Sequence, residues 1–166
     1  MKLVGNLCGW IEKLLAVLCV TGFIVMFALS VATVFFRFVV ESSLAFPDEL
    51  IRYLFVWMTA LGSAVAFRRN SHAAIGIIVD NLPGILKRFG LLIATTATGI
   101  FALILIYQGF HLTSRVVPQI SPALEISMAW VYAAVPVGGL FLLIFAVEMF
   151  LQQSTASDAE LVAGSQ

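Results

Sequence analysis

The sequence predicts an all-α membrane protein with four transmembrane helices, and three observations lead to this prediction. Of the 166 residues, 61% are hydrophobic and only 11% are charged, whereas soluble domains carry about 25% charged residues. The apolar residues gather in four stretches that are long enough to cross the hydrocarbon core of a bilayer as helices. Lipid offers no water to backbone groups, so each stretch must satisfy its own hydrogen bonds as a helix.

Each span has its own sequence features. The first contains no charged residue. The second begins with charges at the membrane rim, and its length of 20 residues corresponds to about 30 Å of helix. The fourth contains Pro136, where we expect a kink, and Glu148 near its end. The predicted spans are residues 14–36, 48–67, 89–110 and 128–151, and together they place residues 1–152 in a single transmembrane domain.

Two segments outside the spans have distinct patterns. Between spans two and three, apolar residues recur with helical spacing over 75–82 and stop before Pro83. This predicts a short amphipathic helix that lies in the membrane interface. Residues 153–166 are polar, and we expect a disordered cytoplasmic tail there. Cys8 and Cys19 are eleven residues apart on one predicted helix, which is too far for a disulfide between them.

The distribution of basic residues predicts the orientation of the chain. Four spans place both termini on the same side of the membrane. That side holds six of the nine lysines and arginines, and the opposite side holds Arg37, Arg52 and Arg115. Cytoplasmic loops are enriched in basic residues, so we expect a multi-pass membrane protein with both termini in the cytoplasm.

Several classes of function are disfavoured by composition. The net charge is zero and no basic block is present, which argues against nucleic-acid binding. His72 and His111 fall on opposite membrane faces in this topology, so they do not form a metal site, and no set of Cys and His has ligand spacing. We expect no catalytic residues and no cofactor. The spans hold few ionisable residues, which argues against transport by this chain alone.

The start of the second span carries three charged residues, Asp48, Glu49 and Arg52. Acids in the first turn complement the helix dipole, and the spacing places all three on one face. One interpretation is therefore a capped helix start whose charges pair with each other at the membrane rim. The other is a charged patch that docks a second protein or helix.

The same helix continues with small residues and ends with basic ones. Ala60 and Ala64 form a small-xxx-small pair, which permits close approach of another helix, either from this chain or from a partner. At the inner end stand Arg68, Arg69 and His72. These residues would either anchor the helix at phospholipid headgroups or contact a partner subunit.

Two blocks of sequence resemble a known family. The first block runs Asp48-Glu49-x-x-Arg52, Val56-Trp57, Leu61-Gly62-Ser63-Ala64, then Arg68 and His72. In the second, Ser121-Pro122-Ala123-Leu124 precedes Trp130, Tyr132 and Pro136-x-Gly138. Both blocks are similar to the small, DctQ-like membrane subunit of tripartite ATP-independent periplasmic (TRAP) transporters, and the resemblance covers roughly residues 10–150.

The resemblance implies a non-catalytic scaffold subunit in a bacterial inner membrane. Such a subunit would brace a large, DctM-like membrane subunit and help to dock a periplasmic substrate-binding protein. The system would take up an organic acid, of the dicarboxylate or sialic acid class, with an ion gradient that is usually sodium. The candidate interface residues are Asp48, Glu49, Arg52, Trp57, Ala60, Ala64, Arg68, Arg69, His72, Trp130 and Tyr132.

A second hypothesis does not require the resemblance. The chain would then be a free-standing small membrane protein, such as a homo-oligomeric channel or a membrane assembly factor. It would function without a larger membrane subunit, so the proteins that co-purify with it would distinguish the two hypotheses.

Overall fold

The computed structural model describes residues 2–40, 46–70 and 84–163 of the chain. Within these residues the chain is almost entirely helical, and the only strand-like pairing is an isolated bridge in one loop. The interfacial helix expected over residues 75–82, together with His72, lies outside the described residues. The helices are α1 (Lys2–Phe38), α2 (Phe46–Asn70), α4 (Gly84–Arg115), α5 (Ala129–Tyr132) and α6 (Ala134–Ala163).

The four predicted spans are confirmed as long apolar helices. Four helical stretches, one for each predicted span, are long and apolar enough to cross a membrane. The helices extend beyond the predicted limits because polar residues at a span end continue the helix rather than stop it. Most notably, α6 continues to Ala163, so helix occupies most of the tail for which the sequence predicts disorder.

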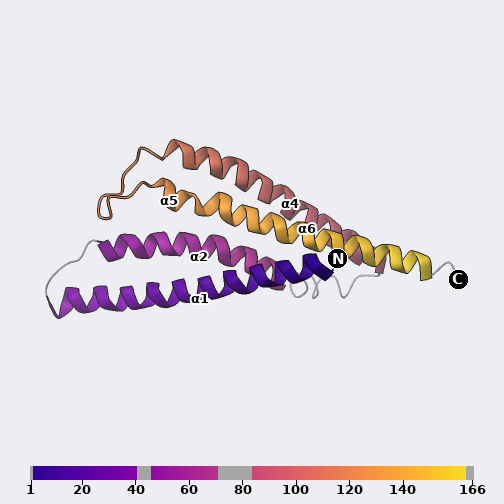
Figure 1. Cartoon of the computed structure of the whole chain (residues 1–166), viewed down its shortest axis with the longest axis horizontal. Helices are drawn as coiled ribbons and strands as arrows, with labels where there is room; N and C mark the ends of the chain where they lie inside the picture. The colour runs from indigo at the N-terminus through magenta and orange to yellow at the C-terminus, as the bar shows by residue number, and fades with distance from the viewer. Residues whose placement is uncertain (1, 41–45, 71–83, 164–166) are drawn as a thin grey trace.

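The long helices lie side by side in the order α1, α2, α6, α4 (Figure 1). Within the described residues, α2 packs against α1 and α6, and α6 packs against α2 and α4, while α4 makes no substantial contact with α1 or α2. α1 also contacts α6, yet without substantial contact between α4 and α1 or α2 the chain forms an open layer rather than a closed four-helix bundle. Both described ends of the chain, in α1 and α6, lie toward the same end of this layer, as four spans require.

Close contacts between helices depend on small residues of this chain. A Cβ added at Gly138 of α6 would lie 2.9 Å from the Ala60 Cβ and 3.0 Å from the Ala60 carbonyl oxygen of α2. At Gly139, a Cβ would lie 3.2 Å from the Ala102 carbonyl oxygen of α4. Ala64 is fully buried. The small residues singled out on the second span therefore pack against the chain's own helices.

Pro136 explains why the fourth span is divided into α5 and α6. α5 ends at Tyr132 and α6 begins at Ala134, and Ala133 between them, three residues before Pro136, keeps a right-handed helical backbone with φ −59° and ψ −21°. A helical residue at 136 would donate its N–H to the carbonyl of Tyr132, and proline has no N–H and clashes with that carbonyl. Helical bonding resumes with the Val137 N–H, which donates to the Ala133 carbonyl at 3.2 Å.

An apolar groove of about 400 Å³ lies between α2 and α4, over α6. It exists because α2 and α4 both contact α6 but not each other, and small residues form part of its lining. The lining residues are Phe55, Val56, Thr59, Ala60, Ser63, Phe101, Leu105, Val135, Gly138, Gly139 and Leu142.

Candidate functional site

The three charged residues at the start of α2 form no ion pairs with one another. Glu49 is only 6% exposed and points into the protein, whereas Asp48 and Arg52 are exposed. The Arg52 Nε donates to the backbone carbonyl of Asp48 at 3.2 Å. None of the ion pairs in the described part of the chain joins these three residues. Self-pairing of Glu49 with Arg52, which was one of the two interpretations, is not found in the structure, because Glu49 finds its donors mainly in another segment.

The donors to the Glu49 carboxylate come mainly from the loop that connects α4 to α5. The Ser121 hydroxyl donates to Oε1 at 2.5 Å, and the N–H groups of Ala123 and Leu124 donate to Oε2 at 2.9 and 3.1 Å. The Tyr53 hydroxyl, one turn along α2, donates to the same carboxylate. Burial of a charge is costly unless donors compensate for it, and four donors do so here.

The loop held by Glu49 is a small antiparallel hairpin, residues 116–128, which we call the outer hairpin. Ile120 and Ser127 form an antiparallel bridge. On either side of it, the Ser121 N–H donates to the Ile126 carbonyl and the Met128 N–H to the Gln119 carbonyl, both at 2.9 Å. Glu125 turns the chain with a φ of 53°, in the left-handed region that non-glycine residues seldom occupy.

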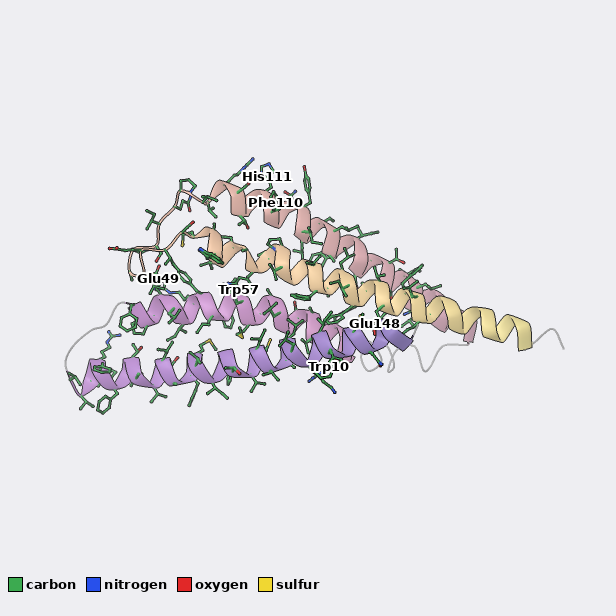
Figure 2. The ribbon with its side chains drawn as sticks, viewed as in Figure 1. Trp10, Glu49, Trp57, Phe110, His111 and Glu148 are labelled. Atoms are coloured by element: carbon green, nitrogen blue, oxygen red, sulfur yellow. The ribbon has the colours of Figure 1, made fainter. Side chains whose placement is uncertain are left out.

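A second link joins α2 to the segment after the outer hairpin. The Trp57 Nε1 donates to the Trp130 carbonyl at 3.1 Å. The Trp130 side chain is 70% exposed, and Tyr132 is half-buried. Figure 2 shows Glu49 and Trp57 on the side of α2 that faces α5 and α6. The predicted residues Trp57 and Trp130 are thus brought together by a hydrogen bond between two helices.

The opposite end of the layer holds a cluster of four charged residues, which we call the inner charge cluster. Arg68 of α2 donates to both carboxylate oxygens of Glu148 of α6, at 2.8 and 2.9 Å, and also pairs with Glu12 of α1. Arg69 pairs with Glu12 at 2.6 Å. The Arg68 guanidinium also lies 5.5 Å from the centre of the Phe145 ring. Three helices are therefore joined at one point.

This cluster explains two arginines that the sequence interpretation assigned to headgroups or a partner. Glu148 is only 4% exposed, and the two-pronged contact with Arg68 has the geometry that suits a guanidinium and a carboxylate. Sequence reasoning missed Glu12 and did not connect Glu148 with Arg68. The sequence did contain a signal for this cluster. Glu12, Arg68 and Glu148 all stand near the inner ends of different helices, and ionisable residues at the same depth in a membrane usually pair.

The two polar sites mark the two ends of an apolar band. Glu49 and Arg68 are separated on α2 by a rise of about 28 Å, close to the thickness of about 30 Å of a hydrocarbon core. Figure 2 places Glu49 and Glu148 toward opposite ends of the layer. In the part of the chain that the structure describes, no three His, Cys, Asp or Glu side chains are grouped as a metal site requires.

Comparison with known proteins decides the family. The family model for "Tripartite ATP-independent periplasmic transporters, DctQ component" matches residues 26–156, which include both α2 and the outer hairpin. This chain belongs to the DctQ component family. It is thus a small permease subunit of the TRAP type, as the two sequence blocks predict.

Several relatives have names that agree with this family. The sialic acid TRAP transporter small permease protein SiaQ of Vibrio cholerae is 25% identical over 98% of this chain and 95% of its own length. The ectoine TRAP transporter small permease protein TeaB of Halomonas elongata is 29% identical over 83% of this chain and 72% of its own length. The chain spans about half of one Haemophilus influenzae relative, 48%, and 78% of another.

One relative is a much longer protein. The sialic acid TRAP transporter permease protein SiaT of Haemophilus influenzae is 28% identical over 82% of this chain, but the match covers only 21% of SiaT. A DctQ-like segment therefore exists within a single longer permease chain.

Proposed function

We propose that this DctQ-component chain is a non-catalytic scaffold that braces the large membrane subunit of a TRAP transporter and helps to dock its periplasmic substrate-binding protein. The transporter would use an ion gradient, most simply of sodium, to take up an organic acid of the dicarboxylate or sialic acid class. The chain would lie in a bacterial inner membrane with both termini in the cytoplasm.

The observation that carries the proposal is how the buried charges of the chain are used. The two buried acids among the described residues, Glu49 and Glu148, lie at opposite ends of the apolar band. Each holds helices or loops of this chain together through several donors. Transport sites, in contrast, place ionisable groups near the middle of the membrane. Charges that are used for rigidity favour a brace over a carrier.

The relatives support a role that does not depend on one substrate. Relatives named for ectoine, for sialic acid and for C4-dicarboxylate transport all match this chain. A function shared among systems with such different cargo is more easily explained by support of the large membrane subunit than by recognition of the cargo.

The partnership with a large subunit is supported by the longer relatives. The matches cover 21% of SiaT and 14% of an isethionate TRAP transporter permease protein DctMQ of Oleidesulfovibrio alaskensis. In those chains the DctQ-like segment is covalently joined to a longer permease. We infer that this chain, too, binds a large permease subunit.

Capture of the tagged chain from native membranes in a mild detergent, followed by mass spectrometry, tests the proposal. We expect a much larger membrane subunit to co-purify in a fixed ratio. Arg68→Ala breaks the inner charge cluster and should reduce that recovery, whereas Lys13→Ala, which changes an exposed cation on α1, should not. Recovery of the chain alone, or only as a homo-oligomer, would favour the free-standing hypothesis instead.

A further inference from the structure

The outer hairpin exposes aliphatic side chains that the Glu49 site does not use. Ile120 is 68% exposed, Val117 55% and Ile126 40%. Exposed aliphatic residues are expected along the spans, where lipid covers them. Exposed aliphatic residues on a loop beyond the spans require a different explanation, since soluble surfaces seldom leave apolar patches without a partner.

The position of the hairpin along α4 indicates that lipid tails do not cover it. Tyr107 and Phe110 are more than 70% exposed near the outer end of α4, as in the aromatic belt at a membrane interface. Arg115, at the end of α4, lies about 7 Å further along the axis, and the headgroup region is itself about 5–7 Å thick on each side. The hairpin follows Arg115 and projects past the end of α4 (Figure 1).

The Glu49 site determines which way the hairpin faces. Successive side chains in a paired strand point to opposite faces. Ser121 is 1% exposed and donates to Glu49, so its neighbour Ile120, which pairs with Ser127 in the bridge, points away from α2. By holding Ser121 inward, the carboxylate therefore fixes Ile120 outward.

We propose that the outward face of the hairpin, centred on Ile120, is the surface on which the soluble substrate-binding protein docks, with Glu49 as the positioning residue that holds this surface in place. This rests on the proposed function. The exposed side chains of Asp48, Arg52 and Glu125 lie on the hairpin or on the turn beneath it. The surface thus suits a protein that presents a small apolar patch bordered by charges of both signs, as is common in transient interfaces.

Two variants test the surface. Ile120→Glu places a charge at the centre of the proposed contact, and Val40→Glu makes the same change at a half-exposed aliphatic residue that follows α1 on the same side of the membrane. The complex with the large subunit is placed in lipid nanodiscs, and binding of the separately purified substrate-binding protein is measured by interferometry. We expect Ile120→Glu to weaken binding about tenfold or more, as for a central contact residue, and Val40→Glu to leave it unchanged.

A third variant separates positioning from contact. In Glu49→Ala the hairpin loses the acceptor that holds it to α2. The hydrogen bonds within the hairpin should then open more often, so exchange of the Ser121, Glu125 and Met128 amide protons should accelerate. Binding of the substrate-binding protein should weaken as well. Ile120→Glu should weaken binding without a change in that exchange, and Glu49→Asp should restore part of both. If Glu49→Ala accelerates exchange but binds normally, the positioning role is refuted.

The outcomes also distinguish this inference from the function on which it rests. Normal binding by Ile120→Glu, in a complex that retains the large subunit, overturns the docking surface and leaves the scaffold intact. Loss of the large subunit in Ile120→Glu would show that the hairpin contacts the membrane subunit, which also overturns the inference. Failure of the wild-type chain to capture a large subunit refutes the proposed function itself.

Discussion

Substitution of Gly138 by alanine is the sharpest test of how the layer is held together. The new Cβ would lie 2.9 Å from the Ala60 Cβ, 3.0 Å from the Ala60 carbonyl oxygen and 3.1 Å from its carbonyl carbon. Two of these atoms are backbone, so no side-chain rotation can relieve the clash. Instead α2 and α6 must move apart by several tenths of an ångström over the length of their contact.

The expected cost follows from two opposing terms. Insertion of a methyl group into a well-packed interface costs about 1–3 kcal/mol. A change from glycine to alanine inside a helix gains up to about 1 kcal/mol, but this gain is small when the unfolded state in detergent keeps its helices. We therefore expect Gly138→Ala to lower the free energy of unfolding by about 1–2 kcal/mol.

Two other glycines provide matched controls. Gly99→Ala adds a methyl group where no atom lies within 4 Å, so stability should be unchanged or slightly higher. At Gly22 the three atoms nearest to the added methyl group would all belong to the Met58 side chain, which is flexible enough to move aside. We expect a cost between those of the other two variants.

Unfolding in mixed micelles with increasing dodecyl sulfate is followed by circular dichroism or by tryptophan fluorescence. It gives the free energy of unfolding of each of the three variants relative to the wild type. The reasoning requires the order Gly138→Ala, Gly22→Ala, Gly99→Ala from least to most stable. If Gly138→Ala is as stable as the wild type while Gly99→Ala is not, the close approach of α2 to α6 is refuted.

Two further predictions concern the polar contacts. Arg68→Ala leaves the buried carboxylate of Glu148 without its main partner, so it should lower the free energy of unfolding by about 3–5 kcal/mol. Arg69→Ala changes a side chain that is 57% exposed and should cost less than about 1 kcal/mol. The same micelle titration measures both variants. Trp57→Phe keeps most of the ring but loses the hydrogen bond to the Trp130 carbonyl, so we expect a loss of about 0.5–1.5 kcal/mol, and an equal stability of the two proteins would show that the bond contributes nothing.

The spans could be predicted from the sequence because their signal is local. An apolar run of about 20 residues has no alternative to helix in lipid. The neighbour order α1, α2, α6, α4 could not be predicted. All four spans are apolar on every side, so no polar stripe identifies the inward face, and small residues such as Ala60 show only that some helix approaches closely.

The two polar sites show a related limit. Spacing placed Glu49 and Arg52 on one face, and the helical pairing rule then suggested that they interact. The rule fails because Ser121, 72 residues further along the chain, brings a stronger set of donors to Glu49. The missing signal was the tight turn that follows Ser121. Its Ala123 and Leu124 N–H groups need acceptors, and the buried acid at the start of α2 accepts from both of them.

The contacts of the layer also explain how the hairpin can be a fixed surface although it is a loop. In lipid the hydrophobic effect does not hold helices together, so close packing and polar contacts must do so. Arg68 fixes α1, α2 and α6 at the inner end, and Gly138 brings α2 against α6 in the apolar band. Glu49 then fixes the hairpin to α2 at the outer end.

Because these contacts act on the same helix, a displacement of the hairpin would have to break the Glu49 site or tilt α2, and a tilt of α2 would disrupt the inner charge cluster. A loop held in this way keeps its position relative to the membrane, which a docking surface for a soluble partner requires.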